Sequence, residues 1–271
     1  MFYEKKYNQL SIYHAPKLDQ QPELVHGFSS KHGGYSKAPF SGLNLGLATG
    51  DDISFVQENR RAFTKALGID PAQVVCGKQV HETNIVRVTA QDGGKGFYEE
   101  ATAFQNTDGL ITDQWGIALM TFYADCVPVL FYDAYQHVIG VCHCGWRGTV
   151  NRMAAKMATA MMDAYGCKAE HLYVAIGPSI SQGQYEVDRT VLEKFEKAFS
   201  FSSIIILSTD ENHGKIDLWK ANQLQLEELG LLPEHIEVSG LCTYQNVDTF
   251  YSHRAEQGKA GRNGAIIMMK K

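Results

Sequence analysis

The sequence predicts an α+β fold: a single-domain layered sandwich of mixed β-sheets flanked by helices, spanning residues 1–271. Short runs rich in β-branched and aromatic residues alternate with segments of helical periodicity, which is typical of a layered α+β protein. The strand-like runs between residues 117 and 142 follow one another too closely for crossover helices, so part of the sheet must be antiparallel or mixed. No repeat or long linker divides the chain.

The periodicity predicts four helices and eight strands. The helix expected at 149–165 carries one apolar stripe, formed by Val150, Met153, Met157 and Met161, and Gly166 supplies its stop. The other helices are expected at 53–67, 188–199 and 217–229. The strands are expected at 24–28, 84–88, 117–122, 127–132, 137–142, 172–176, 236–238 and 265–269.

Composition and charge indicate which kinds of molecule the protein binds. The formal net charge is -5 and the Lys and Arg residues are scattered, which argues against nucleic acid and against a membrane surface. No apolar stretch approaches the roughly 20 residues that span a bilayer, and the first residues lack the apolar core of a signal peptide. We therefore expect a cytoplasmic protein that acts on small molecules, with its six cysteines reduced. The sequence predicts no oligomeric state.

Three residues far apart in the sequence could share a metal. His81, Cys126 and His143 offer two imidazoles and a thiolate, a three-ligand set that leaves a fourth zinc position open for water or substrate. Two other interpretations stay open from the residues alone. Cys126 and His143 could be a nucleophile and its base, or a small buried thiol and a hydrogen-bonded core histidine.

A glycine-rich turn follows His143. Gly145-Trp146-Arg147-Gly148-Thr149 runs into a predicted helix, where backbone N–H groups and the Arg147 guanidinium could bind a phosphate. The alternative is a plain loop in which Thr149 caps the helix and Arg147 lies in solvent.

Two further polar clusters lie in predicted loops. Asn44 could bind substrate or brace a turn. Arg254 and Arg262 surround a loop near the C-terminus that is either an anion-binding rim or a solvated turn.

Five motifs follow one another along nearly the whole chain: Pro39-Phe40-Ser41-Gly42-Leu43-Asn44-Leu45-Gly46, Glu58-Asn59-Arg60-Arg61, Gln79-Val80-His81, Ala124-Asp125-Cys126-Val127-Pro128-Val129 and His143-Cys144-Gly145-Trp146-Arg147-Gly148. In this order they resemble the YfiH/YlmD family of laccase-domain proteins. The resemblance implies a single-domain sandwich of mixed sheets flanked by helices. It also implies a mononuclear zinc held by His81, Cys126 and His143.

The resemblance implies several activities. Members of the family are described as copper polyphenol oxidases, as cysteine-hydrolase-like editors of peptidoglycan precursors, and as purine nucleoside phosphorylases with adenosine deaminase and methylthioadenosine phosphorylase side activities. A multicopper laccase needs about ten ligands, mostly in His-x-His pairs. This chain has ten histidines and no His-x-His pair, which excludes multicopper chemistry, although a lone copper ion would also suit the three ligands.

The phosphorylase interpretation suits the residues best. Arg147, helped by Arg61, Arg254 or Arg262, would bind phosphate, and the metal triad would activate water for deamination. Asp125 would act as a proton shuttle or, more in keeping with its place beside Cys126, orient a metal ligand. The alternative is an amidase that edits peptidoglycan precursors with Cys126 as nucleophile. A third interpretation is a non-catalytic partner of the cell-division or cell-wall machinery.

The sequence departs from the family pattern in three places. Cys144 stands where alanine is usual, and Lys31-His32 stands where an arginine is common. The C-terminal motif reads His253-Arg254-Ala255-Glu256 instead of two adjacent arginines and an acid. These changes affect which cations bind phosphate but not the metal triad.

Overall fold

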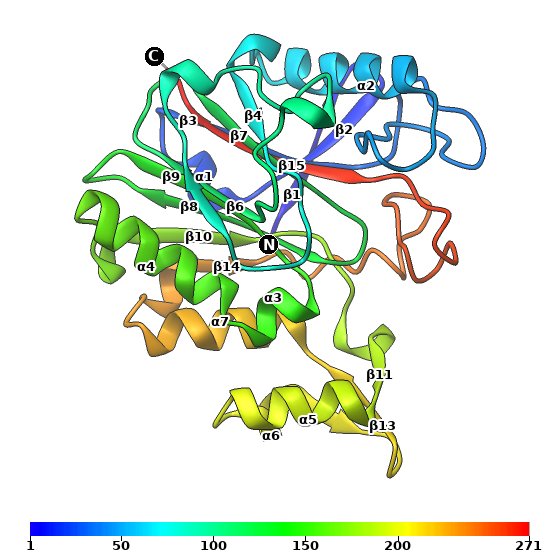
Figure 1. The fold of residues 1–271 in the computed structure, drawn as a ribbon, viewed down its shortest axis with the longest axis vertical. Helices are drawn as coiled ribbons and strands as arrows, with labels where there is room; N and C mark the ends of the chain where they lie inside the picture. Colours follow the sequence, from blue (N-terminus) through cyan, green and yellow to red (C-terminus); the bar gives the residue numbers. More distant parts are fainter. Residues whose placement is uncertain (271) are drawn as a thin grey trace.

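Two six-stranded β-sheets lie face to face in the computed structural model, which describes residues 1–270 (Figure 1). The first sheet contains, in spatial order, β1 (Tyr3–Tyr7), β2 (Leu10–His14), β3 (Leu24–Ser29), β15 (Asn263–Met269), β7 (Ala118–Tyr123) and β4 (Val74–Cys76). The second contains β14 (Ile236–Val238), β10 (Leu172–Ile176), β8 (Val127–Asp133), β9 (Val138–Cys144), β6 (Gly109–Thr112) and β5 (Ile85–Arg87).

Both sheets are mixed. In the first sheet β15 is antiparallel to β3 and β7, whereas β4 is parallel to β7. In the second sheet β8 is antiparallel to β9, whereas β10 is parallel to β14. The prediction of mixed sheets is confirmed, and so are all eight predicted strands. Most of these strands carry β-branched or aromatic residues that the structure buries, whereas β5 is only partly buried.

Helices cover the outer faces of the two sheets. The helices are α1 (Pro16–Asp19), α2 (Ile53–Ala66), α3 (Trp146–Val150), α4 (Met153–Tyr165), α5 (Arg189–Ala198), α6 (Ser202–Ile205) and α7 (Leu218–Glu228). Short 3-10 helices lie at Pro71–Gln73, Ala90–Asp92, Glu100–Thr102, Ala169–His171, Gln182–Gln184 and Pro233–His235. In Figure 1, α2 lies over the first sheet and α4 and α7 lie over the second, which gives a helix–sheet–sheet–helix order of layers.

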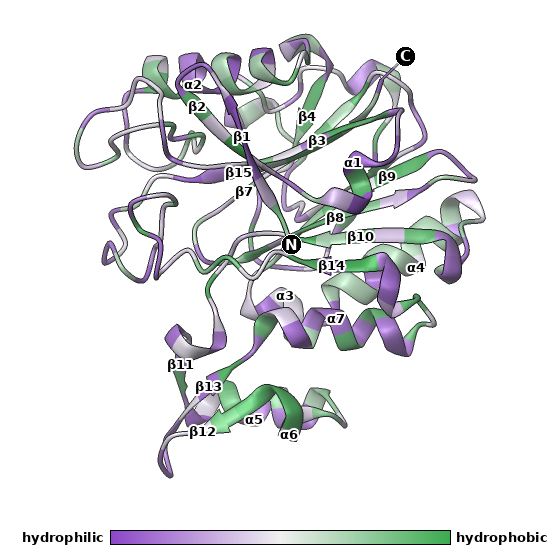
Figure 2. Ribbon diagram, turned by 180° about the vertical axis from the view of Figure 1, so that it is seen from behind, coloured by the Kyte–Doolittle hydropathy of each residue, from purple (hydrophilic) through white to green (hydrophobic). Residues whose placement is uncertain are grey.

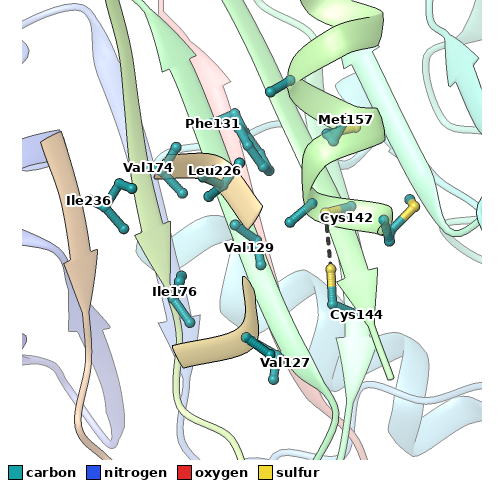
Figure 3. Close-up of a cluster of buried hydrophobic side chains, with 14 of the residues drawn as sticks. Val127, Val129, Phe131, Cys142, Cys144, Met157, Val174, Ile176, Leu226 and Ile236 are labelled. Carbon is teal, nitrogen blue, oxygen red and sulfur yellow. Dashed lines mark hydrogen bonds between the residues drawn. The ribbon is translucent and has the colours of Figure 1, made fainter. Parts of the chain in front are cut away.

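The core under α4 shows why this helix forms where it does. Met153, Met157 and Met161 are fully buried, as the predicted apolar stripe requires, and they pack with β8, β9 and β10 (Figure 3). Gly140 in β9 lets the helix approach closely, since a Cβ there would lie 2.8 Å from the Cε of Met157. The apolar stripe therefore fixes α4 against the second sheet.

The start of this helix was predicted wrongly. The chain forms α3 first, turns through Arg152 in the left-handed region at φ 62°, and begins α4 at Met153. The N-cap of α3 is Gly145 and not Thr149, which lies inside the helix. A separate α3 directly follows β9, and it carries Trp146 and Arg147.

Several strands escaped prediction because they are short or polar. β1 reads Tyr-Glu-Lys-Lys-Tyr and is an exposed edge strand, drawn as a hydrophilic ribbon in Figure 2. A third, three-stranded sheet contains β11 (Glu186–Asp188), β13 (His213–Ile216) and β12 (Ile206–Ser208). It packs with α5 and α6 at one end of the molecule (Figure 1).

Within residues 1–270, none of the helices combines the length and the apolar character needed to cross a bilayer.

Gly177 offers a test of how the two sheets pack. A Cβ at this position would strike the ring of Phe28, a fully buried residue of β3, and would lie 2.8 Å from the Cγ of Pro128. Gly177→Ala should therefore lower the free energy of unfolding by about 1–3 kcal/mol, as overpacking does. Gly183→Ala is the matched control, because nothing lies within 4 Å of its added Cβ. Urea unfolding measures both, and equal midpoints for the two variants would contradict the packing.

Candidate metal and anion site

The three predicted metal ligands come together at one edge of the second sheet. His143 is the penultimate residue of β9, Cys126 immediately precedes β8, and His81 lies in the loop between β4 and β5. Because β8 is antiparallel to β9, its first residue lies beside the last residue of β9. One ligand atom from each of the three residues lies within 4.8 Å of the others. The His81 and His143 rings are 4.8 Å apart at 77°.

Asp108 is the residue that holds this arrangement. It immediately precedes β6, on the other side of β9, and it is fully buried. Its Oδ1 accepts hydrogen bonds from Nδ1 of His143, at 2.8 Å, and from the backbone N–H of His81, at 3.0 Å. Its Oδ2 accepts from the N–H groups of Val80 and Glu82. One carboxylate therefore fixes two of the three ligands.

Sequence reasoning missed Asp108. An aspartate in Thr107-Asp108-Gly109, just before a strand, was the available signal, but it was not distinguishable from an ordinary turn residue.

The electrostatics of the triad favour charged groups. Burial alone would raise the pKa of the Cys126 thiol, but the imidazoles of His143 and His81 lower it to about 6. Burial alone would lower the pKa of His143, but the Cys126 thiolate and the Asp108 carboxylate raise it to about 10. Burial likewise opposes the ionisation of Asp108, yet hydrogen bonds from His143 and the backbone keep its pKa below the usual value. The group is a thiolate next to an imidazolium.

Three features of the site suit a metal ion. Nδ1 of His143 donates to Asp108, which leaves Nε2 as the free ligand atom, an arrangement common at protein metal sites. Cys126 has the thiolate form that metals bind. Gly145 keeps space open beside all three ligands, since a Cβ there would lie 3.0 Å from His81 Cδ2, 3.1 Å from Cys126 Sγ and 3.7 Å from His143 Cε1. The residues fit a mononuclear ion with an open position.

A cavity of about 540 Å³ adjoins the triad. Its polar wall contains His81, Cys126 and His143, and its apolar wall includes Phe122, Ile180 and Leu218. Tyr185, from the segment that leads into the third sheet, also lines it. A cavity of this size matches those that bind small molecules.

Three of the four predicted phosphate-binding arginines line this cavity: Arg147, Arg254 and Arg262. Within residues 1–270, none of them pairs with a carboxylate. Arg254 donates to the carbonyl of Glu186, and Arg262 donates to the carbonyls of Ala260 and Gly261. Their charges therefore remain available to an anion in the cavity.

Two of the predicted substrate-binding residues lie elsewhere. Arg61 is outside the cavity lining, on the exposed face of α2, where it pairs with Glu58. Asn44 is fully buried and braces its own loop: Nδ2 donates to Thr49 and Asp51, and Oδ1 accepts from the backbone N–H of Gly46 and Arg262. The structure thus gives Asn44 the role of a turn brace.

Arg60, the neighbour of Arg61, lines the cavity instead. Val56, Asn59, Arg60, Phe63 and Thr64 form the buried face of α2, a spacing that could have identified Arg60 as the inward-facing arginine. Its guanidinium donates to the carbonyls of Leu45, Gly96 and Phe97 and lies 4.0 Å from the centre of the Phe122 ring.

Asp125 lines the cavity but does not orient a metal ligand. Its Oδ1 accepts from the Thr243 hydroxyl at 2.6 Å, and its Oδ2 accepts from the backbone N–H of Arg254 at 2.7 Å. The residue has φ 80°, so its backbone is in the left-handed region. Asp125 therefore fixes the loop that carries Arg254, whereas the carboxylate hydrogen-bonded to His143 and His81 is Asp108.

The additional thiol at Cys144 faces away from the cavity. Its Sγ lies 3.5 Å from the Sγ of Cys142, and both side chains are fully buried in the core under α4 (Figure 3). In a strand these two residues point to the face opposite to His143. Cys142 and Cys144 are core residues and not members of the ligand set.

A second group of candidate ligands is less suited to a metal. His14, Asp19 and His26 also lie within 4.8 Å of one another. Nε2 of His26, however, accepts a hydrogen bond from the N–H of Ala15, and burial lowers the pKa of His26 to about 3. The neutral ring therefore carries its one proton on Nδ1, which removes that atom as a ligand.

Comparison with known proteins supports the family expected from the motifs. A family model described as "Multi-copper polyphenol oxidoreductase laccase" matches residues 25–270. "Purine nucleoside phosphorylase YlmD" of Bacillus subtilis is 38% identical over 248 residues, which cover 92% of this chain and 89% of the relative. "Adenosine deaminase RL5", from an unknown prokaryotic organism, is 32% identical over 258 residues, which cover 94% of this chain and 98% of the relative.

A solved structure agrees with the whole fold. The crystal structure of YlmD from Geobacillus stearothermophilus superposes with a TM-score of 0.94 at 36% identity, covering 100% of this chain and 99% of that one. The resemblance drawn from the motifs is thereby confirmed, and so is the α+β fold class. The chain belongs to the laccase-domain family of YfiH- and YlmD-type proteins.

Proposed function

We propose that this chain is a zinc-dependent purine nucleoside phosphorylase. It would cleave adenosine- and inosine-type nucleosides with phosphate and have adenosine deaminase and methylthioadenosine phosphorylase side activities. The observation that carries the proposal is a single cavity that combines the His81, Cys126 and His143 triad with arginines that no carboxylate neutralises. The two relatives described above are named for phosphorolysis of purine nucleosides and for deamination of adenosine.

Phosphorolysis needs an anion held beside the sugar. A phosphate oxygen attacks the anomeric carbon, the bond from that carbon to the purine nitrogen breaks, and its electron pair leaves with the base. Arg147, Arg254 and Arg262 would neutralise the phosphate and fix its orientation, and the apolar wall of the cavity would hold the purine away from water. Because Asp125 holds the N–H of Arg254, it would act as a positioning residue for the anion site.

Deamination needs water in place of phosphate. A zinc ion held by His81, Cys126 and His143 would supply Lewis-acid activation of that water at neutral pH. Asp108 would keep His143 in the tautomer that presents Nε2, and Gly145 would leave room for the substrate atom under attack. A lone copper ion would suit the same three ligands, so metal analysis belongs to the test.

One observation favours a second candidate function, a peptidoglycan-precursor editing amidase. The Cys126 thiolate lies next to His143, whose other nitrogen donates to Asp108, as in a cysteine–histidine–carboxylate triad. His81 argues for the metal, because a nucleophile and base would not need a second imidazole beside the thiolate.

Zinc content tests the ligand set. The purified protein should carry one zinc ion, and His81→Ala, Cys126→Ser or His143→Ala should each remove the metal and both activities together. Asp108→Asn should keep the three ligands but weaken zinc binding by about 10–100-fold, because it removes the negative charge beside His143 and replaces one of the two accepting oxygens with an NH2 donor. His32→Ala, an exposed histidine outside the cavity, is the matched control. Elemental analysis and competition with a chelating dye give the measurements; an active protein without metal would refute the proposal.

Arg147 is the residue on which the phosphate site most depends. Arg147→Ala should raise the phosphate KM of phosphorolysis by at least about tenfold, since a charge-assisted contact contributes roughly 1.5–3 kcal/mol. Deamination, which uses water, should lose less. Arg61→Ala, at an arginine outside the cavity that pairs with Glu58, should change neither reaction. Equal losses in both reactions for Arg147→Ala would show that this residue supports the nucleoside or the fold instead.

The reactivity of Cys126 separates the two candidate functions. As a zinc ligand the thiolate should resist iodoacetamide until a chelator removes the metal, and no covalent intermediate should form during turnover. As a nucleophile it should be alkylated in active, metal-free protein, and an acyl adduct should be trapped on it. Mass spectrometry reads the modification directly. Full activity on a peptidoglycan precursor after exhaustive chelation, with an adduct on Cys126, would establish the amidase.

A further inference from the structure

A second cavity, of about 490 Å³, lies beside the first. It is lined by Trp146, Arg147, Val150 and Asn151 from α3 and its end, and by Lys194, Lys197 and Ala198 from α5. We call this second cavity the cationic groove. Trp146 and Arg147 belong to the linings of both cavities, so the groove borders the proposed active site directly.

The groove concentrates positive charge. Arg147, Lys194 and Lys197 line it, and its lining contains no acidic residue. In the described part of the chain none of these three cations forms an ion pair. The acids of α5, Glu193 and Glu196, pair with Arg189. Three positive charges that no carboxylate neutralises therefore line one groove, although the chain has a net charge of -5.

The Trp146 ring holds two of these cations near one another. The guanidinium carbon of Arg147 lies 4.4 Å from the ring centre, and the ammonium of Lys194 lies 5.2 Å from it. Cation–π attraction offsets part of the repulsion between the two like charges. Lys197 is three residues beyond Lys194, on the same side of α5. The arrangement presents several N–H donors to an anion placed against the indole.

We propose that the cationic groove binds the phosphate group of a nucleoside monophosphate whose nucleoside occupies the neighbouring cavity. This inference rests on the proposed function, because that function places a nucleoside beside Arg147. A phosphate monoester carries between one and two negative charges near neutral pH and accepts several hydrogen bonds, which matches three unpaired cations at the end of a nucleoside site. The protein would then accept phosphorylated nucleosides, with Lys194 and Lys197 as specificity-determining residues.

Equilibrium binding to the zinc-loaded protein tests the proposal. Isothermal titration calorimetry gives Kd for adenosine, adenosine 5′-monophosphate and inorganic phosphate, at low and at high ionic strength. We expect the monophosphate to bind at least about tenfold more tightly than adenosine, and this preference to shrink as salt screens the groove. Lys194→Gln with Lys197→Gln should reduce the ratio of the two Kd values to near one. Lys6→Gln with Lys168→Gln removes the same charge from exposed lysines outside both cavities and should leave the ratio unchanged.

The outcomes separate the groove from the proposed function. If adenosine is bound and phosphorolysed but the monophosphate binds no more tightly, the groove proposal is wrong and the function stands. If the monophosphate binds through Lys194 and Lys197 but no nucleoside reacts, the function is wrong and the groove still binds phosphate. If inorganic phosphate alone competes for the two lysines as well as the monophosphate does, the groove is a free-anion site and the proposed substrate class is refuted.

Discussion

The hydrogen bonds accepted by Asp108 are the constraint on which the site depends. A buried carboxylate is unfavourable unless its charge is balanced and its lone pairs are used, and here four donors satisfy it. Three of these donors are consecutive backbone N–H groups from residues 80–82, and the fourth is the His143 imidazole. The loop that carries one predicted metal ligand, His81, is thereby bound to the strand that carries another, His143. Losing this carboxylate would disturb two ligands at once and leave buried donors without partners.

Strained backbone at the site is consistent with this constraint. His81 has φ 64° and Asp125 has φ 80°, both in the left-handed region that non-glycine residues seldom adopt. Such a conformation costs on the order of 1 kcal/mol or more and persists only where the surroundings fix it. The bond from the N–H of His81 to Asp108 fixes the first, and the bonds from Thr243 and Arg254 fix the carboxylate of the second. Both strained residues line the same cavity.

The sequence predicted what depends on local pattern. Met153, Met157 and Met161 have the spacing of a buried helical face, and residues 127–132 form a continuous apolar run, so both elements were identified. It could not predict features whose cause is tertiary. Arg152 breaks a helix that the stripe alone would continue, and β1 owes its place to pairing with β2 and not to its charged side chains.

At the candidate site too, local sequence patterns predicted some features, whereas others depend on tertiary contacts. The motifs that resemble the family named His81, Cys126 and His143, and the structure brings these three side chains together. The family motif also contains two adjacent arginines. The motif alone does not distinguish the two, but the helical spacing of Val56, Asn59 and Phe63 places Arg60 on the buried face of α2, and the structure places it in the cavity lining and Arg61 outside it. Asp108 could not be identified from the local sequence, because its hydrogen-bond partners are 26 to 35 residues away.

The charge balance of the triad supports a divalent ion as its occupant. Without a metal, the negative charges of Asp108 and the Cys126 thiolate are balanced in part by protonation of His143, which is why the pKa of its imidazole is raised to about 10. Metal binding requires neutral imidazoles, so His143 must give up its Nε2 proton while its Nδ1 proton remains on the bond to Asp108. The two negative charges then remain, and an ion of charge +2 neutralises them completely. A monovalent ion would leave one buried negative charge uncompensated, which is unfavourable away from water. The charges of the residues that surround the site therefore favour a divalent ion, and the proposed zinc meets this requirement.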